Sequence, residues 1–142
     1  MKKVFLGGTC NDSKWRNKLI QLLKIEYFNP VVEDWTPECM EEEIKQRETC
    51  DFCLYVITPK MTGVYSIAEV IDDSNKRPQK TIFCFLEEDE NPIQQLTSMP
   101  IEKLKFDKGQ LRSLKQVSKM VVNNGGKYFK SLKEIADYLN HQ

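Results

Sequence analysis

Short apolar runs alternate along this chain with longer segments in which apolar residues recur every three or four positions. The apolar runs predict strands at residues 3–6, 31–32, 52–57, 81–86 and 127–129. The periodic segments predict helices at residues 13–24, 37–48, 66–75 and 110–122, and a closing helix that begins after Ser131. Strands that alternate with helices in this way indicate a parallel sheet with right-handed crossover connections.

The expected architecture is an α/β, flavodoxin-like three-layer sandwich whose parallel sheet has about five strands. The chain has 142 residues, which is near the common size of a domain and enough for a core on both faces of the sheet. We therefore expect residues 1–142 to form a single domain. Residues 87–100 are polar and contain two prolines, which predicts a long loop near the carboxyl edge of the sheet that could serve as a lid.

The charges of the chain balance, with 21 basic and 21 acidic residues. This balance argues against a nucleic-acid backbone or a membrane surface as the main partner, and it leaves small molecules as candidates. No apolar run approaches the length of a transmembrane helix, and the first residues lack the apolar stretch of a signal peptide. The sequence thus predicts a cytoplasmic protein with a small-molecule partner.

The five cysteines are expected to be reduced thiols in such a protein. Cys50 and Cys53 form a Cys-x-x-Cys pair, but the pair leads into an apolar strand instead of opening a helix, which favours buried structural thiols over redox or zinc chemistry. His141 is the only histidine and lies next to the C-terminus, which argues against a histidine-based triad or zinc site. We expect no metal and no cofactor, so carboxylates must carry any acid–base chemistry.

Polar residues follow several predicted strands and should meet at the carboxyl edge of the sheet, where α/β proteins bind ligands. The candidate binding residues there are Gly7, Gly8, Thr9, Asn11, Asp34, Trp35, Thr58 and Ser66. The glycines allow close approach to the backbone, and the hydroxyl and amide groups offer hydrogen bonds. Asp34 and Trp35 together suit a sugar hydroxyl and a stacked base, or alternatively an Asx turn and a core tryptophan.

Glu69 is the most informative carboxylate, because it lies one short loop beyond the predicted strand 52–57 and at the start of a helix. We expect it to be exposed, oriented and ionised near that helix N-terminus. Ser66, three residues earlier, has the spacing of a capping box, so Glu69 could alternatively do no more than cap its own helix.

Two further charged groups have alternative roles. In the glutamate-rich helix after Trp35, periodicity favours Glu43 over Glu42 as the side chain that points into the cleft. Arg16 is interpreted as a solvent-exposed helix charge, with contact to a substrate phosphate as the alternative. Asp51 precedes a buried strand and is interpreted as structural.

Three features resemble nucleoside 2-deoxyribosyltransferases and their N-glycosidase relatives: Gly7-Gly8-Thr9, the acid at Asp51, and the segment 62–69 that ends in Glu69. The likeness extends over residues 3–86, and residues 4–11 with 28–32 are similar to a compact branch of that superfamily. The resemblance implies the flavodoxin-like fold and a glutamate, Glu69, that attacks the anomeric carbon and forms a glycosyl-enzyme intermediate. It also implies oligomers in which a neighbour's C-terminal segment completes the site.

By the same resemblance, Glu43 matches an acid near the nucleobase, and Asp34 is an alternative for acid–base chemistry or a sugar-hydroxyl contact. The chain differs from some transferases at Gly63, where they carry an acid, and at Phe5, where they carry a tyrosine. Transfer to a second base and hydrolysis of a nucleoside or nucleotide both remain open. A different class, a non-catalytic module that binds a nucleotide or an NAD-derived ligand, would not depend on Glu69.

Overall fold

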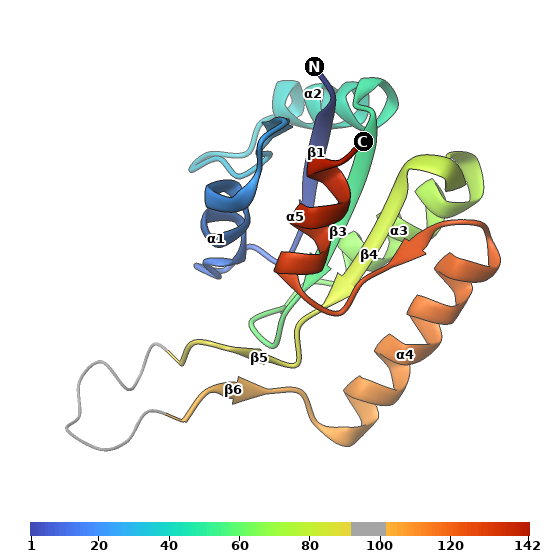
Figure 1. The fold of residues 1–142 in the computed structure, drawn as a ribbon. Coiled ribbons are helices and arrows are strands. Elements are labelled where there is room, and N and C mark those ends of the chain that lie inside the picture. The colour runs from blue at the N-terminus through green and yellow to red at the C-terminus, as the bar shows by residue number, and fades with distance from the viewer. Residues whose placement is uncertain (92–101) are drawn as a thin grey trace.

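The structure is a computed structural model, and residues 1–91 and 102–142 are described from it (Figure 1). The strands are β1 (Lys3–Gly8), β2 (Glu26–Phe28), β3 (Phe52–Ile57), β4 (Thr81–Phe85), β5 (Glu88–Asp89), β6 (Leu104–Lys105) and β7 (Lys127–Tyr128). The helices are α1 (Trp15–Leu22), α2 (Pro37–Thr49), α3 (Tyr65–Lys76), the 3₁₀ turn η1 (Pro78–Lys80), α4 (Lys108–Asn123) and α5 (Leu132–Asn140).

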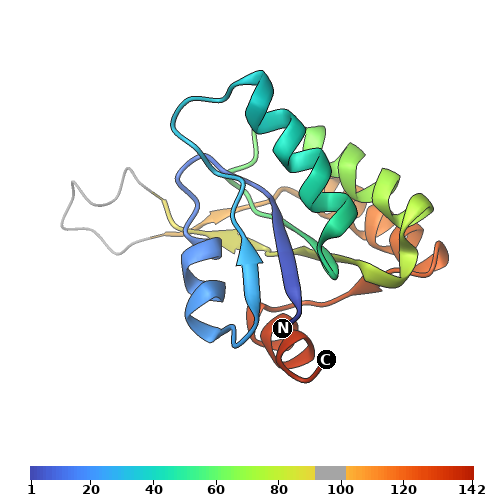
Figure 2. The same ribbon diagram turned by 90° about the horizontal axis from the view of Figure 1, so that it is seen from above.

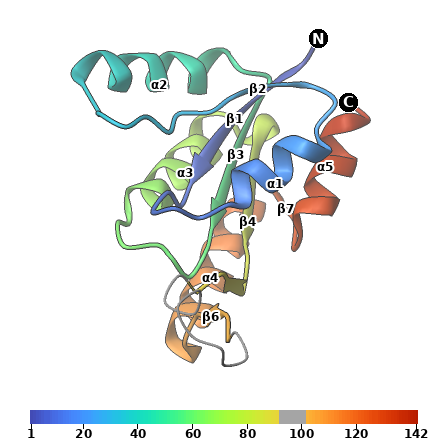
Figure 3. The same cartoon turned by 90° about the vertical axis from the view of Figure 1, so that its left-hand side faces the viewer.

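Within the described residues, five strands form one parallel sheet in the order β2-β1-β3-β4-β7. This is the order of a flavodoxin-like fold, so the predicted fold class is confirmed. Helices α2, α3 and α4 cover one face of the sheet, and α1 and α5 cover the other (Figures 2 and 3). The three layers follow because a parallel sheet is apolar on both faces and needs helices on each.

A separate hydrophobic core lies on each face of the sheet. The core under α1 and α5 includes Trp15, Leu19, Leu54, Ile135 and Leu139. The core under α3 and α4 includes Phe5, Tyr55, Val70, Leu114 and Val121. Strand β3 is buried along its whole length and contributes alternate side chains to both cores, so the loop that follows it begins from a fixed position.

The second strand lies at a different position from the one predicted. The strand is formed by Glu26–Phe28, whereas Val31 and Val32 lie after it and are about half exposed, at 47% and 48%. The Glu26 amide donates to the Lys2 carbonyl, and the Phe28 ring stacks on Phe5 with 5.9 Å between centroids. Pairing with β1 therefore decides the strand, and the valine pair is left free to line a cavity.

Hydroxyl side chains cap two of the helices. Thr36 caps α2 by accepting a hydrogen bond from the Cys39 amide at 3.3 Å. Ser131 caps α5 by accepting from the Glu134 amide, and the Glu134 carboxylate accepts from the amide of Lys130.

The polar segment after β4 is partly a strand. Residues 88–89 pair antiparallel with residues 104–105, where a loop was predicted over 87–100. Residues 92–100 of the predicted lid lie outside the described residues. In the described part of the chain, no helix is long and apolar enough to cross a membrane.

Candidate active site

Two adjoining cavities open at the carboxyl edge of the sheet and share the residues Cys10, Tyr65 and Ser66. The larger, which we call the carboxylate cavity, has a volume of about 540 Å³. Its walls include the apolar side chains Val31, Val32, Trp35, Met40 and Ile44 and the charged side chains Glu43, Arg47 and Glu69. The smaller, which we call the loop cavity, has a volume of about 290 Å³ and is lined mostly by the loops after β1 and β3.

Glu69 lies in the carboxylate cavity, but it is neither exposed nor a cap, contrary to prediction. Its side chain is 16% exposed, and Arg47 Nη1 lies 3.4 Å from Glu69 Oε2. Helix α3 begins at Tyr65, so Ser66 is already helical and no side chain caps this helix. Burial raises the pKa of Glu69 to about 7, although Arg47 acts against the rise. The carboxyl group is therefore about half ionised near neutral pH.

Glu43 lies in the same cavity, one helical turn before Arg47. Burial raises its pKa, while a hydrogen bond from Trp35 and the charges of Arg47 and Arg16 lower it. The glutamate favoured by the periodicity of α2 therefore does face the cavity. Carboxyl groups with raised pKa values are common in active sites, where they act as acids, bases or nucleophiles. Two of them in one cavity therefore indicate a candidate catalytic site.

Trp35 and Asp34 have different positions, although they are neighbours in the sequence. Trp35 is 57% exposed and lines the carboxylate cavity, so the alternative of a core tryptophan is wrong. Asp34 is exposed and lines neither cavity. The structure thus brings Trp35 to the two glutamates and leaves the Asp34 carboxylate outside.

The hydroxyl groups of Thr9 and Thr58, both predicted to bind a ligand, instead hold the loops together. Thr9 Oγ1 accepts from the Thr58 amide at 3.0 Å, and the Thr58 hydroxyl donates to Asp89 at 2.5 Å. Thr58 is fully buried and lines neither cavity, whereas Thr9 lines the loop cavity. The Asn11 amide group donates to the Lys60 carbonyl and to the Thr62 hydroxyl, both at 2.9 Å.

Arg16 is buried, so its interpretation as a solvent-exposed charge is wrong. The residue is 4% exposed, and its side chain donates to the carbonyl groups of Leu6, Gly8 and Thr9 at 2.7–3.1 Å. The guanidinium thereby satisfies the backbone at the end of β1, where the sheet offers no partner. With its donors directed at these carbonyls and no place in the lining of either cavity, Arg16 is a poor candidate for a phosphate contact.

The remaining sequence interpretations concern structural residues. Asp51 accepts a hydrogen bond from the Lys3 amide at 2.9 Å and joins the starts of β1 and β3, as its structural interpretation requires. Cys50 and Cys53 are buried free thiols, and burial raises the pKa of Cys53 to about 12. Burial and a raised pKa both disfavour the reactive thiolate, which agrees with the structural interpretation of the two thiols.

The tightest backbone packing at the site is at Gly8, where β1 turns toward the cavities. Its φ of 121° is in the region that favours glycine, and a Cβ would stand 2.0 Å from the Val56 carbonyl oxygen. A side chain also fails to fit at Gly7, because a Cβ would lie 2.6 Å from the Tyr55 ring. The absence of a side chain at these two positions allows β1 and β3 to pack closely. Gly8 also lines the loop cavity.

We predict that Gly8→Ala lowers the free energy of unfolding by about 2–3 kcal/mol, through strain and a backbone clash. The matched control is Gly63→Ala, since a Cβ there meets nothing within 4 Å. The control should stay within about 0.5 kcal/mol of the parent. Urea unfolding of the three proteins measures both values, and equal stabilities for the two variants would contradict the prediction.

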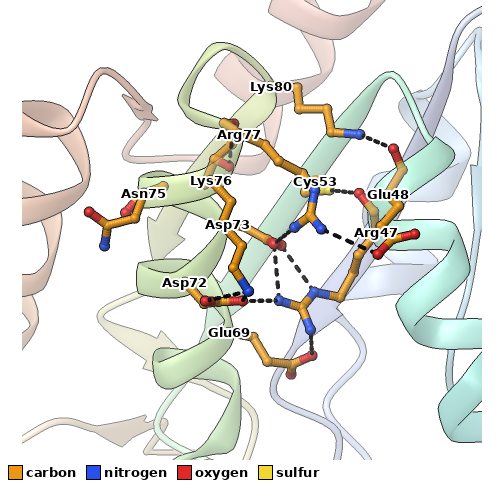
Figure 4. A network of polar contacts seen from close by, with 12 residues as sticks. Arg47, Glu48, Cys53, Glu69, Asp72, Asp73, Asn75, Lys76, Arg77 and Lys80 are labelled. Carbon is orange, nitrogen blue, oxygen red and sulfur yellow. Dashed lines mark hydrogen bonds and ion pairs between the residues drawn. The ribbon is translucent and has the colours of Figure 1, made fainter.

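A network missed by the sequence analysis lies behind Glu69 (Figure 4). Asp73, with a fully buried side chain, accepts from Arg47 Nε at 3.1 Å, from Arg47 Nη2 at 3.0 Å and from the Tyr55 hydroxyl at 2.5 Å. Arg77 also pairs with Asp73, and Asp72 lies 3.3 Å from Arg47 Nη2.

The fold and the site together define the class of protein: an α/β, flavodoxin-like domain with a two-carboxylate cavity at the carboxyl edge of its sheet. The model of the family described as nucleoside 2-deoxyribosyltransferase like matches residues 1–88. This span is more than half of the 142-residue chain and contains every residue that lines the two cavities. The chain therefore belongs to the nucleoside 2-deoxyribosyltransferase-like family. Searches of curated proteins and of solved structures gave no match.

Proposed function

We propose that this protein cleaves or transfers at the N-glycosidic bond of a nucleoside or nucleotide, with Glu69 as the nucleophile. The main support for this proposal is the position of two carboxyl groups. Glu69 and Glu43 face one cavity of about 540 Å³, and its other walls are largely apolar. Membership of the nucleoside 2-deoxyribosyltransferase-like family supports the same class of substrate. Cavities of this size, mostly apolar with a few polar groups, are typical of small-molecule sites.

In the proposed mechanism the two carboxyl groups act in different protonation states, as in most glycosidases. Ionised Glu69 attacks the anomeric carbon while the bond from that carbon to the base nitrogen breaks, and the bonding pair leaves with the base. Protonated Glu43 supplies a proton to the departing base, and Glu69 is left as a glycosyl ester. Water or a second base then attacks the anomeric carbon and gives its proton to deprotonated Glu43, while the ester bond returns its electron pair to Glu69.

The surroundings of Glu43 suit a nucleobase. Trp35 lines the cavity beside it and offers a broad apolar face for stacking, together with the aliphatic side chains Met40 and Ile44. The hydrogen bond from Trp35 to Glu43 ties the ring to the proposed acid. The base therefore lies on the α2 side of the cavity and the sugar on the α3 side, next to Glu69.

The test is chromatography of free bases after incubation with nucleosides, deoxynucleosides, mononucleotides and NAD, each with and without an acceptor base. Base release without an acceptor would establish hydrolysis, and exchange that needs an acceptor would establish transfer. Glu69→Gln serves to show that either product arises at this site. If no compound yields a product while one of them still raises the melting temperature, the protein is a binding module and the proposed reaction is wrong.

A further inference from the structure

The guanidinium of Arg47 is held so that one nitrogen remains for Glu69. Its Nε and Nη2 both donate to the Asp73 carboxylate, which fixes the plane of the group, and Nη1 lies beside Glu69 Oε2 (Figure 4). Among the described residues, no hydrogen bond to Glu69 is present and Arg47 is the cation paired with it. Glu69 thus has one oxygen paired and the other without a partner in the described part of the chain.

Asp73 is itself immobilised from three directions. It accepts from the Tyr55 hydroxyl on β3, from Arg47 on α2 and from Arg77, the residue that follows its own helix, and its side chain has no exposure. Tyr55 is completely buried in the sheet. Because three different elements meet at this carboxylate, the direction in which Arg47 points is set by the core of the fold and not by solvent.

We propose that Arg47 is a positioning residue for the reaction: oriented by Asp73 and Tyr55, it holds one oxygen of Glu69, leaves the other for the substrate, and keeps the carboxylate charged in a buried site. This role rests on the proposed function. Bidentate contact with Asp73 explains why the group must be an arginine, since a lysine is a point charge and cannot fix a plane.

The charges around Glu69 make this role necessary. In the described part of the chain, the other groups that act on its charge are acidic: Glu43 on α2, Asp72 and Asp73 on α3, and Tyr55 on β3. Burial and these acids raise the pKa of Glu69, and Arg47 is the group that lowers it. Removing Arg47 must therefore move the pKa of Glu69 above about 7, which leaves less of the nucleophilic form at neutral pH.

The competing explanation is that Arg47 only ties α2 to α3. Arg77 provides the matched control, because it also pairs with Asp73 and reaches toward α2, where its Nη2 lies 3.9 Å from Glu48. It has no ion pair with Glu69 in the described part of the chain. Loss of either arginine should lower stability, whereas only the loss of Arg47 should change the ionisation of Glu69.

The decisive experiment is a ¹³C NMR titration of the glutamate side-chain carboxyl groups in the full chain, with the Glu69 signal assigned by its loss in Glu69→Gln. We expect the Glu69 midpoint to rise by about one pH unit or more in Arg47→Gln and to stay near its original value in Arg77→Gln. Arg47→Lys, which retains the positive charge, should give a smaller rise. If Arg47→Gln does not fold, Arg47→Lys decides alone, and an unchanged midpoint in it overturns the proposal.

The activity readout then separates this inference from the proposed function. Because ionised Glu69 is the reactive form, base release should increase with pH up to its pKa, and the acid limb should move upward in Arg47→Gln by as much as the NMR midpoint. An equal shift in Arg77→Gln would show a merely structural role and overturn the proposal. If the unmodified protein releases no base, the proposed function fails, while the titration still decides whether Arg47 controls the charge of Glu69.

Discussion

Glu69→Gln is expected to lower the rate of base release or exchange by at least about a thousandfold, the scale of losses when an enzymatic nucleophile is removed. The amide has nearly the same size as the carboxylate, but it cannot form the glycosyl ester or offer a full negative charge to the oxocarbenium-like transition state. The substitution also removes a carboxyl group whose burial is unfavourable. The variant should therefore fold normally, and its loss of activity must come from the missing nucleophile.

A matched control for this prediction is Glu42→Gln. Glu42 belongs to α2 beside Glu43, but it is exposed and its carboxylate accepts a hydrogen bond from Gln46 at 2.7 Å. Its amide variant should keep the activity of the parent. Mass spectrometry of rapidly quenched parent protein should show the added mass of a sugar residue at Glu69. If Glu69→Gln retains more than about a tenth of the activity, it falls far short of the loss expected for a nucleophile, and another group must attack the sugar.

The sequence was most informative about the fold and the location of the cavities. Periodicity predicted the alternation of strands and helices, and the rule that ligands bind at the carboxyl edge of a parallel sheet selected the loops that surround them. It failed at β2, a three-residue edge strand, because so short a segment has little pattern of its own. Its position depends on pairing with β1, which is a property of the tertiary structure.

Polar side chains next to the cavities were harder to interpret. Thr58 was predicted to face a ligand and Arg16 to face solvent, and both predictions are wrong. The Thr58 hydroxyl donates to the Asp89 carboxylate, and Arg16 donates to backbone carbonyl groups. One-dimensional patterns treat such residues as exposed because charged and hydroxyl groups usually are. Whether a polar side chain faces a ligand or an unpaired carbonyl depends on where neighbouring loops end, and the sequence does not specify that.

The buried network behind Glu69 left two traces in the sequence. Tyr55 stands in the otherwise apolar strand β3, and a buried tyrosine needs a partner for its hydroxyl. Asp73 is four residues after Glu69, so the two carboxylates share one face of α3. Together with an inward Arg47, these positions would have indicated an ion cluster, but which carboxylate the arginine orients could not be deduced from spacing alone.

Asp73→Ala is expected to lower the free energy of unfolding by about 4 kcal/mol, the range seen when one partner of a buried ion pair is removed. The truncation leaves Arg47 facing the core without its bidentate partner and leaves the Tyr55 hydroxyl without an acceptor. The adjacent Asp72→Ala is the matched control, because that side chain is 44% exposed and its pairs with Lys76 and Arg47 are open to solvent. It should cost less than about 1 kcal/mol.

Urea unfolding of the two aspartate variants tests whether the network depends on burial or on charge alone. Both substitutions remove one negative charge, from neighbouring positions of the same helix, so a simple charge effect would make them equal. A loss at Asp73 several times larger than at Asp72 requires that the fully buried carboxylate is the anchor of Arg47. Similar losses would contradict this and would remove the structural basis on which Arg47 is directed at Glu69.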